Sequence, residues 1–205
     1  MVVGDSFLVI GVSGTTNAGK TTLVERLRHE LPEARFLRQD TFFISEDDPR
    51  HQWLETDTFR HQNWELPSAI DFNLFKKEVR LLTASASGLP YRILLLEGHL
   101  LFSDPELVVW CDKKYFLTLS KEQCRERRNR RTYHPSDPPG YFDACIYPEY
   151  LNYLSYVQEN VKDVAYLDGA NPQEMIFQKI FDDIKNLIAA QNFFKTLTVG
   201  DASFS

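Results

Sequence analysis

Short apolar runs recur along the chain between segments with helical spacing of their apolar residues. Residues 6–13 form an apolar run that leads into a glycine-rich segment, and residues 92–96 are almost wholly apolar. Such runs are typical of parallel strands that are buried on both faces of a sheet. Residues 34–38, 115–119 and 164–167 are further short runs that predict strands. The pattern predicts five strands.

Helical patterns lie between these runs. Residues 21–31 and 68–82 each place their apolar side chains on one face. Ser120, followed by Gln123 three residues later, indicates a helix start of the capping-box type, and Pro172 begins a final helix. Strands that alternate with helices predict an α/β fold, with a central parallel sheet flanked by helices on both faces.

The chain of 205 residues is long enough for one domain, and we expect a single domain over residues 1–205. Residues 44–67 are polar and irregular with isolated aromatic side chains, and connections of that length are usually functional or disordered. Residues 192–205 carry a weak pattern, so we expect this tail to fray.

Composition excludes several classes of protein. The net charge of −6 argues against nucleic-acid binding through the whole surface. The three cysteines, Cys111, Cys124 and Cys145, are scattered, which favours neither a disulfide framework nor a zinc site. The chain has no apolar stretch of membrane-spanning length and no signal-peptide pattern at its start. We therefore expect a soluble cytoplasmic protein, with nuclear access possible, that binds neither membranes nor nucleic acid.

The segment between the first predicted strand and its helix matches the pattern G-x-x-x-x-G-K-[ST] over residues 14–21. Its glycines let backbone N–H groups wrap a phosphate, and the helix N-terminus adds a favourable dipole. Lys20 would reach the β- and γ-phosphates, and Thr21 would offer its hydroxyl to Mg²⁺. The alternative is a chance glycine-rich turn. The predicted nucleotide-binding residues in this segment are Gly14, Thr15, Thr16, Asn17, Ala18, Gly19, Lys20, Thr21 and Thr22.

Two acidic residues follow later strands. Asp40 comes just after the second predicted strand, and Glu97 ends the apolar run that begins at Arg92. A kinase needs a carboxylate near the acceptor hydroxyl to orient it and accept its proton. Asp40 is our candidate for this base, and Glu97 is our candidate for the metal shell or for positioning the acceptor. The alternative for each is a helix cap or a solvated strand end.

Five arginines crowd the helix that begins at Ser120. At helical spacing Arg127 and Arg131 share one side, Arg128 and Arg130 flank them, and Arg125 points elsewhere. Like charges this close repel unless anions intervene, and a triphosphate is such an anion. We therefore expect a lid over residues 121–143 in which Arg127 and Arg131 bind the nucleotide. A nuclear-localisation or RNA patch and a solvated helix face are the alternatives.

Two further motif matches are set aside. Residues 124–130 fit the phosphatase pattern Cys-x₅-Arg, but the pattern requires a glycine-rich loop and this segment has helical character. Residues 137–140 fit the D-x-x-G pattern of a GTPase switch, but they do not follow a strand, and the chain has no N-K-x-D motif.

Several segments together resemble one enzyme family. They are residues 11–22, 39–43, 97–102, 115–118, 127–128, 131–133, 138–143 and 166–169. On these segments the chain resembles the nicotinamide riboside kinases, which are among the uridine-kinase-like P-loop kinases. The P-loop itself is shared by many kinases, whereas the loop 138–143 and the strand end 97–102 are far more specific.

The resemblance implies a P-loop kinase that uses ATP and Mg²⁺ to phosphorylate the ribose 5′-hydroxyl of nicotinamide riboside, and of nicotinic acid riboside, in NAD synthesis. It implies that Asp40 is the base, that Lys20 is catalytic, and that Glu97, with Thr21, belongs to the metal site. Whether the chain is a monomer or a dimer is left open.

The resemblance also implies a substrate site. An arginine at the position of Arg128 and an acid from the loop 44–67 would hold the ribose hydroxyls, while an aromatic residue of that loop and Tyr133 would sandwich the pyridine ring. Where the family has a tyrosine and an aspartate, this chain has Trp64 and Glu65, and Trp53 is a competing aromatic residue. Phe43 is expected beside the substrate. A cationic nicotinamide ring suits both aromatic faces and an acidic loop.

Two other functions remain as alternatives. A uridine or cytidine kinase would share the phosphate loop, the base and the lid, and would differ in the residues that contact the ring. A nucleotide-binding regulator would bind ATP without catalysis, but the predicted base and arginine lid argue against it.

Overall fold

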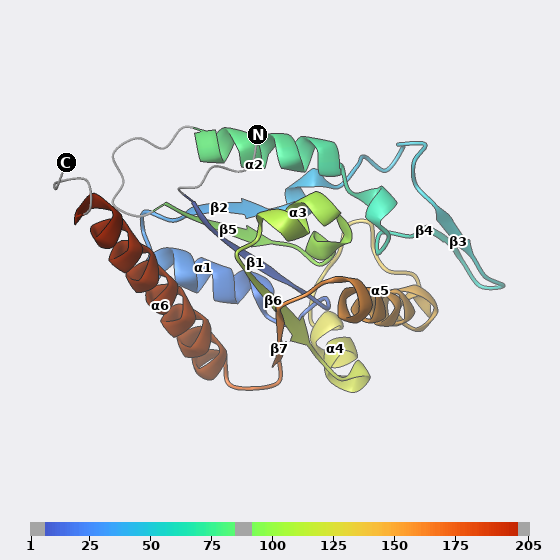
Figure 1. The fold of residues 1–205 in the computed structure, drawn as a ribbon. Helices are drawn as coiled ribbons and strands as arrows, with labels where there is room; N and C mark the ends of the chain where they lie inside the picture. The colour runs from blue at the N-terminus through green and yellow to red at the C-terminus, as the bar shows by residue number, and fades with distance from the viewer. Residues whose placement is uncertain (1–6, 85–91, 201–205) are drawn as a thin grey trace.

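The computed structural model of the chain describes the backbone of residues 7–84 and 92–200 and the side chains of residues 7–84 and 92–190. Five strands form one parallel sheet in the order β2-β5-β1-β6-β7 (Figure 1). This confirms the predicted parallel sheet. The strands are β1 (Leu8–Gly14), β2 (Arg35–Arg38), β5 (Ile93–Glu97), β6 (Lys113–Thr118) and β7 (Val164–Asp168).

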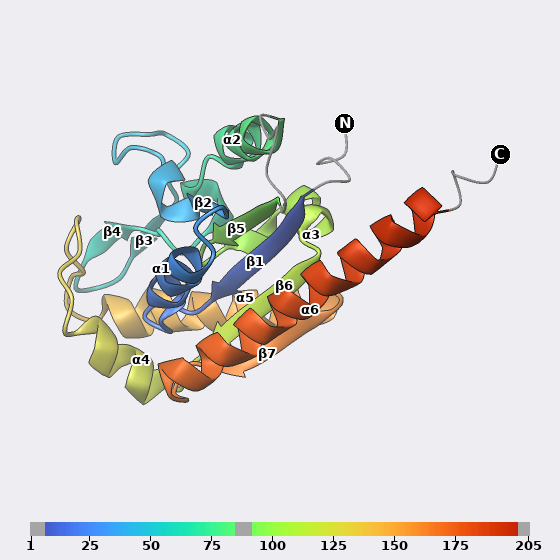
Figure 2. The same cartoon turned by 90° about the vertical axis from the view of Figure 1, so that its left-hand side faces the viewer.

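Helices cover both faces of the sheet. They are α1 (Lys20–Glu30), α2 (Phe72–Ala84), α3 (Pro105–Trp110), α4 (Lys121–Arg128), α5 (Tyr147–Asn160) and α6 (Gln173–Gly200). Successive residues of a strand point to opposite faces, so Ile10 packs with α1 and α6 while Val9 packs with α2, α3 and α5. Figure 2 shows α6 lying along one side of the sheet beside α1. The predicted flanking of the sheet by helices is thereby confirmed.

The strand order decides where the site forms. Strand β1 lies in the centre of the sheet, between β5 and β6, which both come much later in the chain. In such a sheet, ligands bind beyond the carboxyl ends of the strands where the chain order switches. The loops after β1, β2 and β5 therefore meet at one edge, although they are far apart in the sequence.

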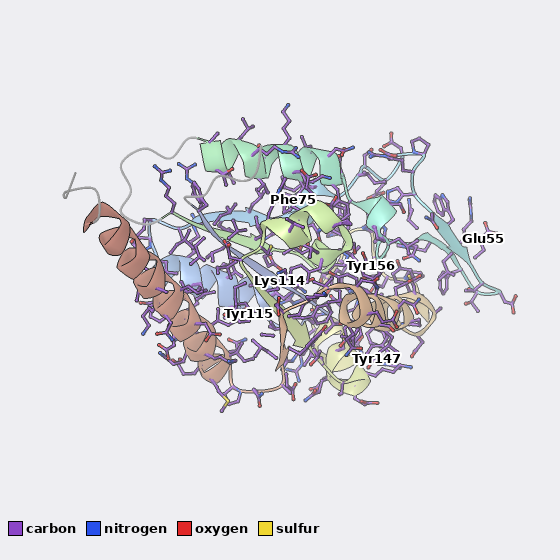
Figure 3. The ribbon with its side chains drawn as sticks, in the orientation of Figure 1. Glu55, Phe75, Lys114, Tyr115, Tyr147 and Tyr156 are labelled. Atoms are coloured by element: carbon purple, nitrogen blue, oxygen red, sulfur yellow. The ribbon has the colours of Figure 1, made fainter. Side chains whose placement is uncertain are left out.

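Four of the described strands and helices, β3, β4, α3 and α5, were not predicted from the apolar pattern. Residues 44–67 contain an antiparallel hairpin of β3 (Trp53–Glu55) and β4 (Arg60–Gln62), where the sequence indicates only an irregular connection. Figure 3 shows Glu55 on this hairpin, away from the sheet. Strands of three residues are too short for a hydrophobic period to appear.

Helices α3 and α5 were not predicted, although each carries a local signal in the sequence. The Asp104 side chain caps α3 by accepting hydrogen bonds from two backbone N–H groups, and Pro105 stands in the first turn. On α5, Tyr150, Tyr153 and Val157 are buried at helical spacing. Helix α6 continues to Gly200 beyond the point where the tail is expected to fray, and residues 201–205 lie outside the described residues.

Candidate active site

The phosphate-loop motif lies in the predicted position, between β1 and α1. Gly14 has a φ of 128° and packs against the backbone of Leu117 on β6, where a Cβ would overlap it. Gly19, at the N-cap of α1, has a φ of 93°. Asn17 is also left-handed, with a φ of 61°, a conformation that asparagine tolerates. The first turn of α1 directs its N–H groups, which no helical carbonyl accepts, toward the loop.

Lys20 is buried and its Nζ donates to the carbonyl oxygens of Gly14 at 2.9 Å and Thr15 at 2.8 Å. Burial lowers the pKa of the Lys20 ammonium from its usual range, and the nearby Glu97 carboxylate opposes this change. The Lys20 ammonium therefore lies against the backbone of the phosphate loop, at its Gly14 and Thr15 carbonyl oxygens.

Glu97, at the end of β5, is buried beside α1. Thr21 donates its hydroxyl to Glu97 Oε1 at 3.3 Å, and Arg38 Nε lies 3.5 Å from Glu97 Oε2. Within the described residues Glu97 Oε2 accepts no hydrogen bond. Burial raises the pKa of the Glu97 carboxyl, and the Lys20 charge partly offsets that rise. A hydroxyl and an unsatisfied carboxylate oxygen are hard oxygen ligands, so this pair fits Mg²⁺.

The donor set is small. Across residues 7–84 and 92–190, no cluster of three or more histidine, cysteine, aspartate or glutamate side chains could hold a metal ion by itself. Protein sites for Mg²⁺ often provide only one or two carboxylates, and substrate phosphates and water complete the shell. Thr21 and Glu97 are therefore sufficient only if a nucleotide supplies further oxygen ligands.

A cavity of about 560 Å³ opens above the phosphate loop and joins most of the predicted residues. The predicted site residues in its wall are Thr16, Asn17, Gly19, Lys20, Thr21, Asp40, Phe43, Trp64, Glu65, Glu97, Arg128, Arg131 and Tyr133. The other predicted residues, Gly14, Thr15, Ala18, Thr22 and Arg127, lie outside this wall. Residues from the loops after β1, β2 and β5 thus surround one space, together with residues 44–46 and 128–137.

Trp64 rather than Trp53 lies in the cavity wall. The Trp64 ring contacts Phe43 edge-on at 5.5 Å and His51 at 4.3 Å between ring centroids. Trp53 is 47% exposed on the hairpin, where the Arg60 guanidinium covers its ring at 4.2 Å. The structure therefore leaves Trp64 as the aromatic residue of this loop that can meet a ligand.

Only some acids of the loop 44–67 face the cavity. Glu46 and Glu65 line it, whereas Asp48 pairs with Arg50 and Glu55 pairs with Arg60. Asp40 lies across from Glu65, with His99 between them. No role for His99 was predicted from the sequence. Its position was the available signal, because His99 lies two residues after Glu97, just beyond the carboxyl end of β5, where ligands bind in parallel sheets.

Arg128 connects three parts of the site. It donates to both carboxylate oxygens of Asp137, at 2.6 and 3.0 Å, and to Thr16 Oγ1 at 3.1 Å. Its guanidinium lies 3.9 Å from the ring centre of Tyr133. The Tyr133 hydroxyl donates to Asn17 Oδ1 at 3.0 Å. One face of the Tyr133 ring is therefore covered by Arg128, and only the other face is left for a second ring.

The remaining arginines separate into different environments. Helix α4 ends at Arg128, so the expectation that Arg127 and Arg131 share one helix face is wrong. Arg127 donates to the carbonyl oxygens of Asn17 and Gly169 and braces the phosphate loop, while Arg131 lines the cavity. Arg125 pairs with Asp143 and so points elsewhere, as predicted; Arg130 pairs with Glu126 on the surface.

The chain is similar to known proteins over most of its length. Residues 10–148 match a family model described as AAA domain. Nicotinamide riboside kinase 1 of Rattus norvegicus is 37% identical, over 90% of this chain and 97% of the relative. Nicotinamide riboside kinase 2 of Homo sapiens is 35% identical, over 87% of this chain and 81% of the relative.

Solved structures support the fold. A gluconokinase from Sinorhizobium meliloti 1021 superposes with a TM-score of 0.54 at 16% identity, covering 91% of this chain and 96% of that one. At this identity the likeness concerns the fold alone. In the described part of the chain, no helix combines the length and apolar character needed to cross a membrane.

Proposed function

We propose a function from this premise: the chain belongs to the nicotinamide riboside kinase family. It transfers the γ-phosphoryl group of ATP to the ribose 5′-hydroxyl of nicotinamide riboside, and of nicotinic acid riboside, and so forms the mononucleotide used in NAD synthesis. The observation that carries this proposal is the shared cavity. It brings the phosphate-loop residues Lys20 and Thr21 together with a carboxylate, Asp40, and a ring-and-acid pair, Trp64 and Glu65.

The transfer requires a base at the acceptor end. Asp40 lines the cavity, and its side chain is 50% exposed, so an acceptor hydroxyl can reach it. Asp40 accepts the proton of the 5′-hydroxyl as the new bond between that oxygen and the γ-phosphorus forms. The bond between the γ-phosphorus and the β–γ bridging oxygen breaks, and ADP leaves with that electron pair.

Positive groups at the other end stabilise the transferred group. The Lys20 ammonium stabilises negative charge on the β- and γ-phosphates, because it is held at the loop that cradles them. Arg131 adds charge from the cavity wall, and Arg127 keeps the loop backbone in shape. Residues 121–143 act as the lid.

Thr21 and Glu97 would hold Mg²⁺. The metal ion, when bound, neutralises phosphate charge and orients the phosphates for in-line transfer. The buried Glu97 carboxylate stays in place because Thr21 donates to it and Arg38 lies beside it.

The ring of the substrate determines the rest of the specificity. A nicotinamide ring attached to ribose carries a positive charge, and aromatic faces attract cations by about 0.5–2 kcal/mol. Trp64, Glu65 and Glu46 line the same cavity, so this wall combines an aromatic surface with negative charge. Arg128 and Glu65 hold the ribose hydroxyls, and Tyr133 lies against the ring on the side opposite Trp64.

The test is an ADP-release assay with Mg-ATP and three acceptor conditions: nicotinamide riboside, uridine and no acceptor. Mass spectrometry identifies the phosphorylated product. We expect turnover with nicotinamide riboside well above the other two conditions. Preferred turnover of uridine would keep the phosphoryl-transfer chemistry and overturn the ring assignment. ATP binding without a phosphorylated product from either acceptor would instead support the alternative function, a nucleotide-binding regulator without catalysis.

A further inference from the structure

His99 lies between the two acids to which the proposed function assigns different tasks. Its Nδ1 is 4.0 Å from Asp40 Oδ1, and its Nε2 is 3.9 Å from Glu65 Oε2. The side chain is 14% exposed and lines the cavity. One imidazole ring therefore spans from the proposed base to the acid proposed to hold the ribose.

Among the described residues, the charges of Lys20 and Arg128 act on these carboxylates from a longer distance, and no ion pair within 4.0 Å other than that with His99 places either of them. In the part of the chain that the structure describes, Asp40 and Glu65 accept no side-chain hydrogen bond, and His99 is the one basic side chain within 4.0 Å of either. A residue that faces both acids is thus the natural candidate to set their separation.

The backbone holds the ring of His99 in position. Ser13 donates its hydroxyl to the His99 carbonyl oxygen at 3.3 Å, and the N–H of Leu100 donates to Gln39 Oε1 at 3.0 Å. Gln39 is fully buried and directly precedes Asp40, so one side chain joins the loop after β5 to the loop after β2. The His99 ring also packs on Phe43 at 5.5 Å with a tilt of 33°.

The gaps of 3.9 and 4.0 Å are slightly too long for hydrogen bonds, and either closes with a shift of about 1 Å or with a bridging water. Carboxylates only accept, so an imidazolium would donate to both acids, whereas a neutral ring would donate to the one that faces its N–H. Catalytic hydrogen bonds are often long before substrate binds. A sugar that moves Glu65 would therefore shift the imidazole of His99, and the shifted imidazole would in turn reposition the Asp40 carboxylate.

We propose that His99 is a positioning residue that couples binding of the ribose hydroxyls at Glu65 to the placement of the base Asp40. The inference rests on the proposed function and deepens it. Its consequence is selectivity for a complete ribose, because a sugar that lacks the 2′-hydroxyl engages Glu65 poorly and leaves Asp40 poorly placed.

The experiment compares nicotinamide riboside with its 2′-deoxy form in the wild type and three variants. His99→Phe keeps a ring against Phe43 but removes both nitrogens, and His99→Gln restores an N–H donor. His61→Phe is the matched control, because His61 is a buried histidine packed on Tyr141 at 4.6 Å, outside the cavity wall. Thermal melting checks that each variant is folded.

In the wild type we expect kcat/KM for the riboside to exceed that for the 2′-deoxy form by at least about 10-fold. His99→Phe lowers kcat for the riboside by about 10- to 100-fold, leaves the KM for ATP unchanged, and brings the two sugars to nearly equal kcat. The difference in kcat/KM that remains then lies in KM, because Glu65 and Arg128 still contact the ribose hydroxyls. His99→Gln recovers part of both losses. His61→Phe keeps the wild-type selectivity.

If the His99→Phe variant folds and retains the wild-type ratio of kcat between the riboside and its 2′-deoxy form, the inference is overturned. A loss in kcat that His99→Gln does not recover, with the sugar ratio unchanged, would assign His99 a packing role instead. If the wild type itself does not phosphorylate the riboside, the proposed function fails, and the inference fails with it.

Discussion

The substitution Arg128→Lys tests how the site is held together, because it removes the planar guanidinium and keeps the positive charge. The guanidinium of Arg128 binds both oxygens of Asp137, donates to Thr16 on the phosphate loop and stacks on Tyr133. A lysine ammonium is a point charge with no planar fork, so it can pair with Asp137 once but cannot keep all three contacts.

The magnitude follows from the contacts that are lost. A second charge-assisted hydrogen bond is worth about 1.5–3 kcal/mol, the bond to Thr16 about 0.5–1.5 kcal/mol, and the stacking on Tyr133 about 0.5–1 kcal/mol. Neighbouring terms are not additive, so we expect a total loss of about 2–4 kcal/mol. Because these contacts hold residues of the cavity wall in place, we expect kcat/KM to fall by about 100-fold. The thermal midpoint falls by about 5–10 °C.

The assay combines thermal melting with steady-state kinetics of Arg128→Lys. Arg125→Lys is the matched control, since Arg125 is on the same helix but exposed, and its pairing with Asp143 is a surface pair worth about 0–1 kcal/mol. We expect the control to behave as the wild type. Arg128→Lys with a thermal midpoint and kcat/KM indistinguishable from those of the control would refute the argument that Arg128 joins Thr16 of the phosphate loop, Asp137 and the Tyr133 ring.

Three further outcomes follow from the site. Asp40→Asn should lower kcat by about 100-fold or more and leave ATP binding unchanged. The thermal midpoint should also stay unchanged, because the Asp40 side chain is half-exposed. Unchanged turnover would show that Asp40 is not the base. Trp64→Leu should raise the KM for nicotinamide riboside by about 5- to 30-fold, and Trp53→Leu should not; equal effects, measured by initial rates, would contradict the assignment of the cavity aromatic. Gly98→Ala should lower the thermal midpoint by several degrees, because its Cβ would lie 2.7 Å from Gln39 Cδ; a midpoint equal to that of the wild type would show that Gln39 can move aside.

Local features of the sequence were sufficient for the sheet, the phosphate loop and the two acids at strand ends. Strand β1, the loop over residues 14–21 and α1 follow one another along the chain, so their signal is contiguous. Asp40 and Glu97 could be nominated because parallel strands bring their carboxyl ends to one edge of the sheet. That the two acids lie close together follows from the pairing of β2 with β5, which the sequence pattern does not show. The hairpin of β3 and β4 was not predicted, because strands of three residues are too short to show an alternating hydrophobic pattern.

Other features depend on contacts between residues distant in the chain, which no local pattern contains. Trp53 and Trp64 both stand in polar surroundings in the sequence, and only the fold turns one toward the cavity and the other onto Arg60. The five arginines of α4 and the turn after it are neighbours along the chain, yet one helix end and separate carboxylates give them different environments. His99, in the loop after β5, acquires its place between two acids only when this loop meets Asp40 after β2 and Glu65 after β4. These acids are 59 and 34 positions away in the chain, and in the fold they face the same ring.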